Sequence, residues 1–381
     1  PNDYCYGPVT ADGAAVPVGP PDALIKANTQ ATATIGEAFS YRITVPTTPH
    51  LVPLYDVRIL DDLGLTGVDL SYVTVTRVSG SAAWTPLNSG IGANLVIEDP
   101  VNGIDIPAGE QIVLDITLRL DDTATNVRGV TFANTATYTY NRLNNAPATI
   151  LPGYAGTSQP MTIVEPENLT LEKSGPAQIQ LGVPATYTLN VHNIGDSPAY
   201  NLTIYDVLPN QADGGTCDAA PTQFTAQLFE ANGTTAVSAL LVEGSDYNVT
   251  FLGDPDCNLT INMLTTAGSV GADQRLIISY QATIDTDSQQ GASLTNIAGA
   301  TEWFSIDVTD PTALNYARTY ARTVTDGTVT TLDHEDAYTS LVFSPLLVFD
   351  KYAINVPSGE DPATVATPGD TIRYGLRVEN T

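Results

Sequence analysis

Positive charge is scarce in this sequence. Across 381 residues, 14 Lys and Arg stand against 42 Asp and Glu, so the formal net charge is 14 − 42 = −28 and the pI is about 4.1. A protein this acidic repels phosphate, which argues against binding to nucleic acid or to an anionic membrane. No apolar run approaches the roughly 18 residues of a membrane-spanning helix. The first residue is Pro1 and no signal-peptide pattern follows it, so we expect a segment of a longer or processed chain.

Motifs of the common enzyme classes are also missing. The sequence contains no G-x-S-x-G, Walker A, H-E-x-x-H or C-x-x-C motif, so we expect no enzyme. His50, His192 and His334 are too dispersed along the chain to indicate a metal site. Neighbouring acids such as Asp61–Asp62 could hold Ca²⁺ in loops, but none has the spacing of an EF-hand. We therefore predict no cofactor, with loop-bound Ca²⁺ as the alternative.

What the sequence does contain is the pattern of an all-β protein. Short runs alternate apolar and polar residues with a period of two, which is typical of half-buried strands. These runs are FSYRITV (39–45), LDITLRL (114–120), TFANTATYTY (131–140), TYTLNVH (186–192) and RLIISYQATI (275–284). The 30 Gly and 26 Pro punctuate the chain at the spacing expected for β-sandwiches. We predict tandem immunoglobulin-like, Greek-key β-sandwiches.

Three segments share one sequence frame, in which a Lys in an apolar strand precedes Gly-x-x-x-x-Tyr and a Val follows four residues after the Tyr. The anchors are Lys26/Gly36/Tyr41/Val45, Lys173/Gly182/Tyr187/Val191 and Lys351/Gly369/Tyr374/Val378. The first two repeats continue in register, whereas the third stops at Thr381 before any acid or closing strand. We predict one sandwich over residues 1–163, a second over 164–345 and an incomplete third over 346–381. Short junctions that contain Pro predict stiff spacing between them.

Lys26, Lys173 and Lys351 are all the lysines of the chain. One interpretation is that a Lys on the first strand protects a sheet edge from aggregation. That interpretation does not explain why all three occupy one register inside an apolar strand and none lies elsewhere. The coincidence favours a chemical role for the amine.

An internal isopeptide bond would require such a lysine. Burial disfavours the charged form, so an amine in a dry core loses its proton and can attack the side-chain amide of an adjacent Asn, releasing ammonia. A buried carboxylic acid would polarise the amide and move the protons. The aligned repeats supply the triads Lys26–Asp61–Asn134 and Lys173–Asp206–Asn296, and Lys351 as an incomplete third. Asp121 and Asp285 also align with each other, but they precede a turn, and we favour Asp61 and Asp206 as the acids.

The order of these residues resembles that of the isopeptide-forming domains of bacterial adhesins and fimbrial proteins of the collagen-adhesin type, with Lys on the first strand and Asn on the last. The segment GVPATYTLNVHNIGDSPAYNLTIYDVLP (182–209) is also similar to a widespread tandem surface repeat with the signature tY-x-v-x-N-x-G…D-x-LP. The first repeat departs from this pattern at DDLGL (61–65) and VPTTPH (45–50). The resemblance implies an extracellular, cell-surface protein whose domains each form one bond and act as passive spacers under tension.

Cysteine is limited to three residues. Cys217 and Cys257 flank a stretch that is peculiar to the second repeat, and we predict a disulfide between them, which would imply an oxidising compartment. Two buried free thiols are the alternative. Cys5 is left over near the N-terminus, free or paired with another chain.

Together these features predict a structural segment, a stalk or filament subunit, of an extracellular cell-surface protein. Its partners would be neighbouring domains or other copies of the same protein, including strand complementation through residues 346–381. The alternative is a carbohydrate- or protein-binding adhesin module that uses the Cys217–Cys257 insertion and aromatic residues such as Trp303. A secreted hydrolase is a third hypothesis, and the missing motifs count against it.

Overall fold

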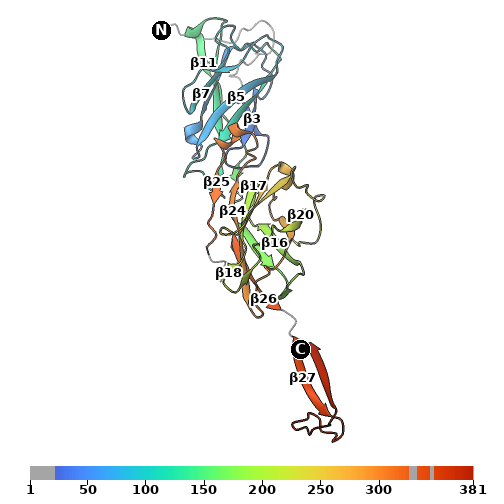
Figure 1. Cartoon of the computed structure of the whole chain (residues 1–381). Coiled ribbons are helices and arrows are strands. Elements are labelled where there is room, and N and C mark those ends of the chain that lie inside the picture. Colours follow the sequence, from blue (N-terminus) through green and yellow to red (C-terminus); the bar gives the residue numbers. More distant parts are fainter. Residues whose placement is uncertain (1–21, 326–332, 344–346, 381) are drawn as a thin grey trace, which may run out of the picture.

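The computed structural model describes residues 22–325, 333–343 and 347–380. Strands dominate this part of the chain, and its single α-helix, α1 (Pro311–Leu314), is four residues long. The prediction of an all-β fold is confirmed. No helix among the described residues is long and apolar enough to cross a membrane. Figure 1 shows two bodies of strands that follow one another end to end.

The first body comprises thirteen strands, which pair only with one another in the described part of the chain. They are β1 (Ile25–Asn28), β2 (Thr32–Ala33), β3 (Ala38–Val45), β4 (Tyr55–Asp62), β5 (Leu70–Ser79), β6 (Leu87–Asn88), β7 (Asn94–Glu98), β8 (Ile112–Leu120), β9 (Thr131–Phe132), β10 (Thr135–Asn141), β11 (Ile150–Pro152), β12 (Gly156–Thr157) and β13 (Met161–Ile163). One sheet has the order β1-β3-β8-β5, and the facing sheet has the order β11-β10-β4-β7-β6, with β12 beside β10. A small third sheet joins β2, β13 and β9. Two 3₁₀ turns, η1 (Leu63–Leu65) and η2 (Pro147–Thr149), complete this body.

The second body repeats this plan. Its strands are β14 (Leu169–Ser174), β15 (Gln178–Gln180), β16 (Ala185–Asn193), β17 (Tyr200–Val207), β18 (Asn210–Gln211), β19 (Gly214–Gly215), β20 (Thr222–Phe229), β21 (Tyr247–Leu252), β22 (Asn258–Met263), β23 (Arg275–Ala282), β24 (Ser293–Phe304), β25 (Thr319–Ala321) and β26 (Glu335–Phe343), with one 3₁₀ turn η3 (Thr266–Gly268). The order β14-β16-β23-β20 matches β1-β3-β8-β5, and β24-β17-β22 matches β10-β4-β7. The second body adds β26 beside β24, where the first has β11 and β12 beside β10.

The alternating runs read from the sequence coincide with central strands. FSYRITV lies in β3, LDITLRL in β8, TYTLNVH in β16 and RLIISYQATI largely in β23, and their inward-facing side chains are buried in alternation. The fifth run, 131–140, is broken into β9 and β10 around Asn134. Ser158 accounts for the break, because its hydroxyl accepts from the Asn134 backbone N–H at 3.0 Å and its own N–H donates to the Asn134 carbonyl.

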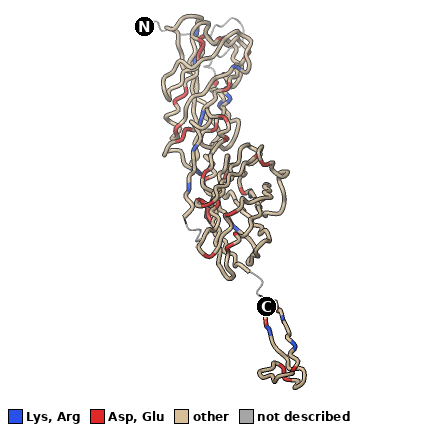
Figure 2. The backbone as a smooth tube through the Cα atoms, in the orientation of Figure 1, with Lys and Arg blue, Asp and Glu red and all other residues tan. Residues whose placement is uncertain are grey.

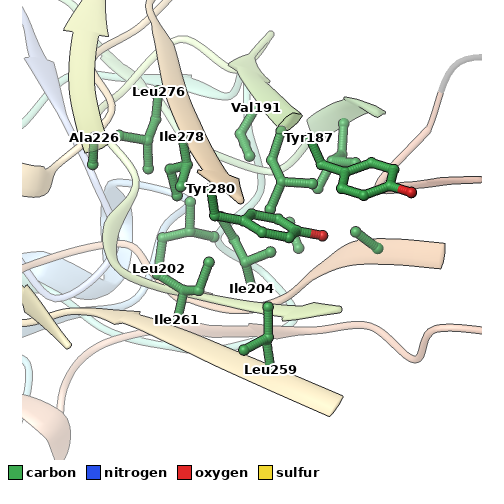
Figure 3. Packing of buried hydrophobic residues seen from close by; sticks show 14 of the residues in the cluster. Tyr187, Val191, Leu202, Ile204, Ala226, Leu259, Ile261, Leu276, Ile278 and Tyr280 are labelled. Atoms are coloured by element: carbon green, nitrogen blue, oxygen red, sulfur yellow. The ribbon is translucent and has the colours of Figure 1, made fainter. Parts of the chain in front are cut away.

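Each body has its own hydrophobic core between its two main sheets. One cluster of buried side chains runs from Leu24 to Ile163 and a separate one from Leu169 to Val342. Figure 3 shows part of the second cluster, with the rings of Tyr187 and Tyr280 among its aliphatic side chains. These two rings stack with centroids 5.8 Å apart. Polar groups that reach this cluster are therefore shielded from water.

The two bodies meet in a joint built around Arg318. Its guanidinium donates to the carboxylates of Asp122 and Glu165 and to the backbone carbonyls of Thr123 and Asn126, with all four distances between 2.6 and 3.0 Å. Glu165 belongs to the junction 164–169 and is almost fully buried. The guanidinium thus links the second body to the first body and to the junction, while the stiffness of this junction stays a prediction. The second junction, 343–348, lies partly outside the described residues.

The last described segment is a two-stranded hairpin of β27 (Leu347–Asn355) and β28 (Ile372–Asn380). Its pairing repeats the start of each sandwich, because Lys351 lies opposite Leu376 as Lys173 lies opposite Leu189. The turn glycine of the frame has positive φ in all three places, 83° at Gly36, 75° at Gly182 and 100° at Gly369. That region of backbone conformation favours glycine over residues with a side chain, which explains the repeated Gly.

Candidate functional site

Both lysines of the described sandwiches lie on edge strands but point inward. Lys26 is on β1 and Lys173 on β14, each the outermost strand of its four-stranded sheet. Their side chains have no exposed surface. A lysine that protects a sheet edge must be exposed to solvent, so the edge-protection interpretation fails at these two positions.

In the first sandwich, Lys26, Asp61 and Asn134 form one hydrogen-bonded group. The Lys26 amine donates to Oδ2 of Asp61, and Nδ2 of Asn134 donates to the same oxygen at 3.3 Å. Asp61 is on β4, opposite Ala136 of β10, and Asn134 precedes that alanine by two residues, which places it on the same face. All three residues are buried. The amine and the amide therefore converge on one carboxylate oxygen.

In the second sandwich, Lys173, Asp206 and Asn296 occupy the same registers. Asp206 of β17 lies opposite Ala298 of β24, and Asn296 precedes that alanine by two residues. The Lys173 amine donates to Oδ2 of Asp206 at 2.6 Å. All three side chains are again buried. The structure thus brings the predicted residues together in both sandwiches, from three strands that are far apart in the sequence.

Burial sets the electrostatics of these groups. Desolvation lowers the pKa of Lys26 to about 8, although the adjacent Asp61 opposes the shift, and desolvation likewise raises the pKa of Asp61. Desolvation also lowers the pKa of Lys173. Both directions favour a neutral amine beside a protonated acid. That is the pair of protonation states that a nucleophilic attack by lysine on an amide requires.

Each triad also contains two buried oxygen atoms without a hydrogen-bond partner. They are Oδ1 of the acid and Oδ1 of the amide: Asp61 and Asn134 in the first triad, Asp206 and Asn296 in the second. Leaving a buried polar atom unpaired costs about 1–3 kcal/mol. The amide oxygen is also the atom on which negative charge develops when a nucleophile adds to the carbonyl carbon. The unpaired atoms therefore lie where an acid and an amide would react.

The competing acids lie elsewhere. Asp121 accepts from the hydroxyl of Ser71 at 2.7 Å. Asp285 accepts from the backbone N–H groups of Cys217 and Asp218, at 3.0 and 2.8 Å, and is buried. The expectation of a solvated turn role is therefore wrong for Asp285, because it holds the chain beside the disulfide.

The Tyr of the shared sequence frame lies beside each lysine. The sequence did not lead us to assign this aromatic ring to the site, although its position in the repeat is regular. The amine of Lys26 lies 4.7 Å from the ring centroid of Tyr41, and that of Lys173 lies 5.7 Å from that of Tyr187. Lys351 lies 4.9 Å from the ring centroid of Tyr374. Lys and Tyr on adjacent strands of one face explain why the frame keeps both.

The hairpin carries the third lysine without a core around it. Lys351 is exposed. The residues that share its face include Phe349 and Leu376, each more than half exposed. No acid or amide contacts this amine within the described residues, so the third triad is incomplete here, as the sequence predicts.

The position of the asparagines corrects one expectation. Asn296 lies on β24, and β25 and β26 follow it, so it is not on the last strand. Asn134 likewise precedes β10 to β13. The shared order of the three residues along the chain is as expected, but a bond between Lys and Asn would not tie the first strand of a sandwich to its last.

The cysteine and metal expectations can be compared with the structure in part. Cys217 and Cys257 form a disulfide, as predicted, while Cys5 lies outside the described residues. Among the residues described, no three or more His, Cys, Asp or Glu are grouped so that they could hold a metal ion.

Trp303, named for the binding-module alternative, is fully buried, and its indole N–H donates to the Pro166 carbonyl at 2.6 Å. It is therefore not available to stack on a ligand.

Comparison with known proteins adds the following. No family model matches the chain, and no curated protein matches it. Among solved structures, it is similar to the C-terminal domain of the Streptococcus agalactiae AgI/II polypeptide BspA, with 8% identity, a TM-score of 0.33, and coverage of 84% of this chain and 99% of that one. It is also similar to the C-terminal domain of the Streptococcus pyogenes antigen I/II-family protein AspA (10%, 0.31, 74% and 95%) and to the collagen adhesin CNA of S. aureus (10%, 0.25, 95% and 96%). Identities and TM-scores at this level establish neither a shared family nor a shared function.

Proposed function

We propose that this chain is a structural segment, a stalk or filament subunit, of an extracellular cell-surface protein, and that each sandwich is locked by a Lys–Asn isopeptide bond. The bonds join Lys26 to Asn134 and Lys173 to Asn296. The observation that carries this proposal is the burial of two equivalent Lys–Asp–Asn groups at matching registers, in a chain that has three lysines in all.

The chemistry needs no external reagent. The neutral amine of the lysine adds to Cγ of the asparagine, the Cγ–Nδ2 bond breaks, and Nδ2 leaves as ammonia with a proton that came from the amine. The aspartic acid polarises the amide and carries that proton, then returns to its starting state. Each site reacts once, because the product is a stable amide. The sandwiches are therefore not enzymes in the sense of turning over a substrate.

The bonds would define which parts of the chain resist tension. They close segments of 134 − 26 = 108 and 296 − 173 = 123 residues. By the loop-closure relation used for disulfides, a tie of this length stabilises a fold by up to about 5 kcal/mol. Tension between the termini would pass through the bond and bypass the closed segment. Residues after each Asn, including β26, stay outside the closed segment and would be the first to extend.

We further propose a three-part organisation of residues 1–163, 164–345 and 346–381, in which the third part begins another locked sandwich. The face of β27 and β28 that carries Lys351 is apolar and exposed. Its occupant would be strands of the same protein that carry an acid and an amide equivalent to Asp206 and Asn296, supplied by a second copy through strand complementation. Concentration-dependent dimerisation in analytical ultracentrifugation, abolished by Phe349→Asp, would support this partner. A monomer at all concentrations would exclude it.

Intact mass spectrometry under reducing conditions tests the main proposal. Two closed bonds predict a mass about 34 Da below that calculated from the sequence, since each bond expels one ammonia of about 17 Da. Lys26→Met and Lys173→Met should each halve the deficit, and proteolytic mapping should recover branched peptides at the stated residues. A full calculated mass for the folded chain would refute the proposal.

A further inference from the structure

The second sandwich contains a residue inside its triad that the first lacks. Tyr280, on β23, is fully buried, and its hydroxyl contacts all three members of the group. The Lys173 amine donates to this oxygen at 3.2 Å, and Nδ2 of Asn296 donates to it at 2.9 Å. The Tyr280 hydroxyl in turn donates to Oδ2 of Asp206 at 2.8 Å. The phenol thus links the nucleophile, the leaving group and the acid.

The first sandwich has no residue equivalent to Tyr280 in its triad. Tyr280 lies opposite Tyr187 in the sheet, and the residue opposite the equivalent Tyr41 is Ile116. There the amide of Asn134 donates directly to the carboxylate of Asp61. In the second sandwich, the amide nitrogen donates to Tyr280 instead. The hydroxyl therefore occupies the path that a proton would take between acid and leaving group.

The protonation state of Tyr280 suits a relay. Burial, with the nearby charge of Asp206, holds the pKa of the phenol well above its usual range, so the group keeps its proton. Its oxygen accepts two hydrogen bonds while its O–H donates one, which uses its hydrogen-bonding capacity in full. By rotation of its O–H bond alone, the phenol can receive a proton from Asp206 and deliver its own to Nδ2, with no movement of the ring.

We propose that Tyr280 is a catalytic residue of the second sandwich, which relays a proton from Asp206 to the departing amide nitrogen. This inference rests on the proposed isopeptide bond. Nζ of Lys173 bonds to Cγ of Asn296 while Asp206 holds a proton. Tyr280 gives its phenolic proton to Nδ2 and takes the proton held by Asp206, which is then free to accept one proton from Nζ. The Cγ–Nδ2 bond then breaks, ammonia leaves, and Tyr280 and Asp206 regain their starting protonation states.

The test compares closure rates of the two bonds in one chain. The full chain is recovered unreacted in urea, where no triad is assembled, then refolded by dilution and sampled over time. Digestion and mass spectrometry score the Lys26–Asn134 and Lys173–Asn296 branched peptides separately. In Tyr280→Phe, the second bond should form at least 100-fold more slowly, in keeping with the usual gain from proton transfer by a side chain. The first bond should form at its normal rate.

Two further variants separate a relay from a packing role. Tyr247→Phe removes the hydroxyl of another buried tyrosine in the same core, outside the triad, and it should leave both rates unchanged. Tyr280→His can both accept and donate a proton, so it should close the second bond faster than Tyr280→Phe. If packing were the only role, the Phe variant, which is closer in shape, would be the faster of the two.

The outcomes are distinct. Closure of the second bond at the normal rate in Tyr280→Phe, or a Phe variant that outruns the His variant, would overturn the relay while leaving the isopeptide proposal intact. Absence of both branched peptides in the unaltered chain would overturn the isopeptide proposal itself.

Discussion

The first and second sandwiches hold the same three residue types in the same registers, yet they connect them differently. In the first, one carboxylate oxygen of Asp61 accepts from both the amine and the amide. In the second, Tyr280 lies between Asp206 and Asn296. The difference comes from one position on the strand that neighbours β3 or β16, Ile116 in one case and Tyr280 in the other. Strand order and register set the positions of the three residues, whereas the residue on the neighbouring strand, β8 or β23, differs and changes which hydrogen bonds join them.

The hairpin offers a third lysine to compare with those of the two sandwiches, and no hydrophobic core covers it. Lys351 has the same strand partner and the same neighbouring Tyr as Lys173, but it is exposed. Desolvation lowers the pKa of Lys173, and this cause requires both sheets of a sandwich. The first two strands thus position the amine, and the rest of the fold would make it reactive.

Acidic charge is spread over both sandwiches, with few Lys and Arg between them (Figure 2). Two carboxylates among the 42 acids, Asp61 and Asp206, face buried lysines. The remaining acids at the surface keep the chain soluble and discourage association with anionic partners. Substitutions in one sandwich leave the other as an internal control for each of the following predictions.

Removing the acid should have the largest effect. We expect Asp206→Ala to stop closure of the second bond and to leave Lys173 buried without its partner. A buried polar group left without its hydrogen-bond partner costs about 1–3 kcal/mol, in addition to the lost cross-link. Intact mass should show a deficit of about 17 Da rather than 34, and the second sandwich should melt first in calorimetry.

Asp121→Ala is the matched control for the acid. It should leave the full mass deficit, because Asp121 contacts Ser71 and not Lys26. If Asp121→Ala removed the first bond and Asp61→Ala did not, the acid of the first triad would be misassigned.

Removing the amide should make one sandwich extensible and leave the other locked. In single-molecule pulling, Asn296→Ala should release the 123 residues between positions 173 and 296, about 400 Å of extended chain. The unaltered chain should release only residues that follow each Asn, for instance 343 − 296 = 47 residues up to the end of β26. Asn134→Ala should free the first sandwich alone. Full extension of either sandwich in the unaltered chain would contradict the proposed bonds.

Much of this arrangement could be predicted because the relevant signals are local in the sequence. Period-two runs predict the strands, and three equally placed lysines predict the repeat. Aligning the two repeats equates Asp61 with Asp206 and Asn134 with Asn296, and the structure places both pairs in the same register. A strand alternates its side chains between two faces, so residues of one register share a face in each repeat.

The parts that could not be predicted depend on contacts between distant strands. Tyr280 looks like an ordinary core tyrosine in RLIISYQATI, and only the sheet pairing places its hydroxyl at the triad. The strands after Asn296 were not expected, because the aligned frame of the two repeats ends near the asparagine, whereas β25 and β26 follow it. Trp303 reads as a candidate for ligand stacking in the sequence, but its indole packs on Tyr320 in the core.

A smaller effect should appear in the pH dependence of a sandwich that cannot close. In Asn134→Ala, Lys26 keeps its free amine, with a pKa lowered from 10.5 to about 8 by burial. Between these values the unfolded chain binds more protons than the folded one, so the free energy of unfolding rises with pH. From pH 8 to 9.5 the gain should be about 2 kcal/mol, at about 1.4 kcal/mol per unit.

Urea unfolding at several pH values would measure this gain. The double variant Lys26→Met with Asn134→Ala lacks the amine and should lose the rise. The unaltered protein should lack it as well, since an amide does not titrate. A rise of the same size in all three proteins would assign it to other groups.

The smallest expected effect concerns the joint rather than the bonds. The planar guanidinium of Arg318 binds Asp122, Glu165 and two backbone carbonyls. In Arg318→Lys, an ammonium with fewer directed hydrogen-bond donors takes its place. We expect a loss of about 1 kcal/mol and a wider distribution of angles between the sandwiches in small-angle X-ray scattering. The mass deficit should not change, because no triad residue contacts Arg318. Arg322→Lys is the control, since Arg322 donates to its own neighbour Ala321 and not across the joint. If both variants left the scattering unchanged, the contacts of Arg119 with Tyr316 and of Ser305 with Ile35 would suffice to hold the two sandwiches in line.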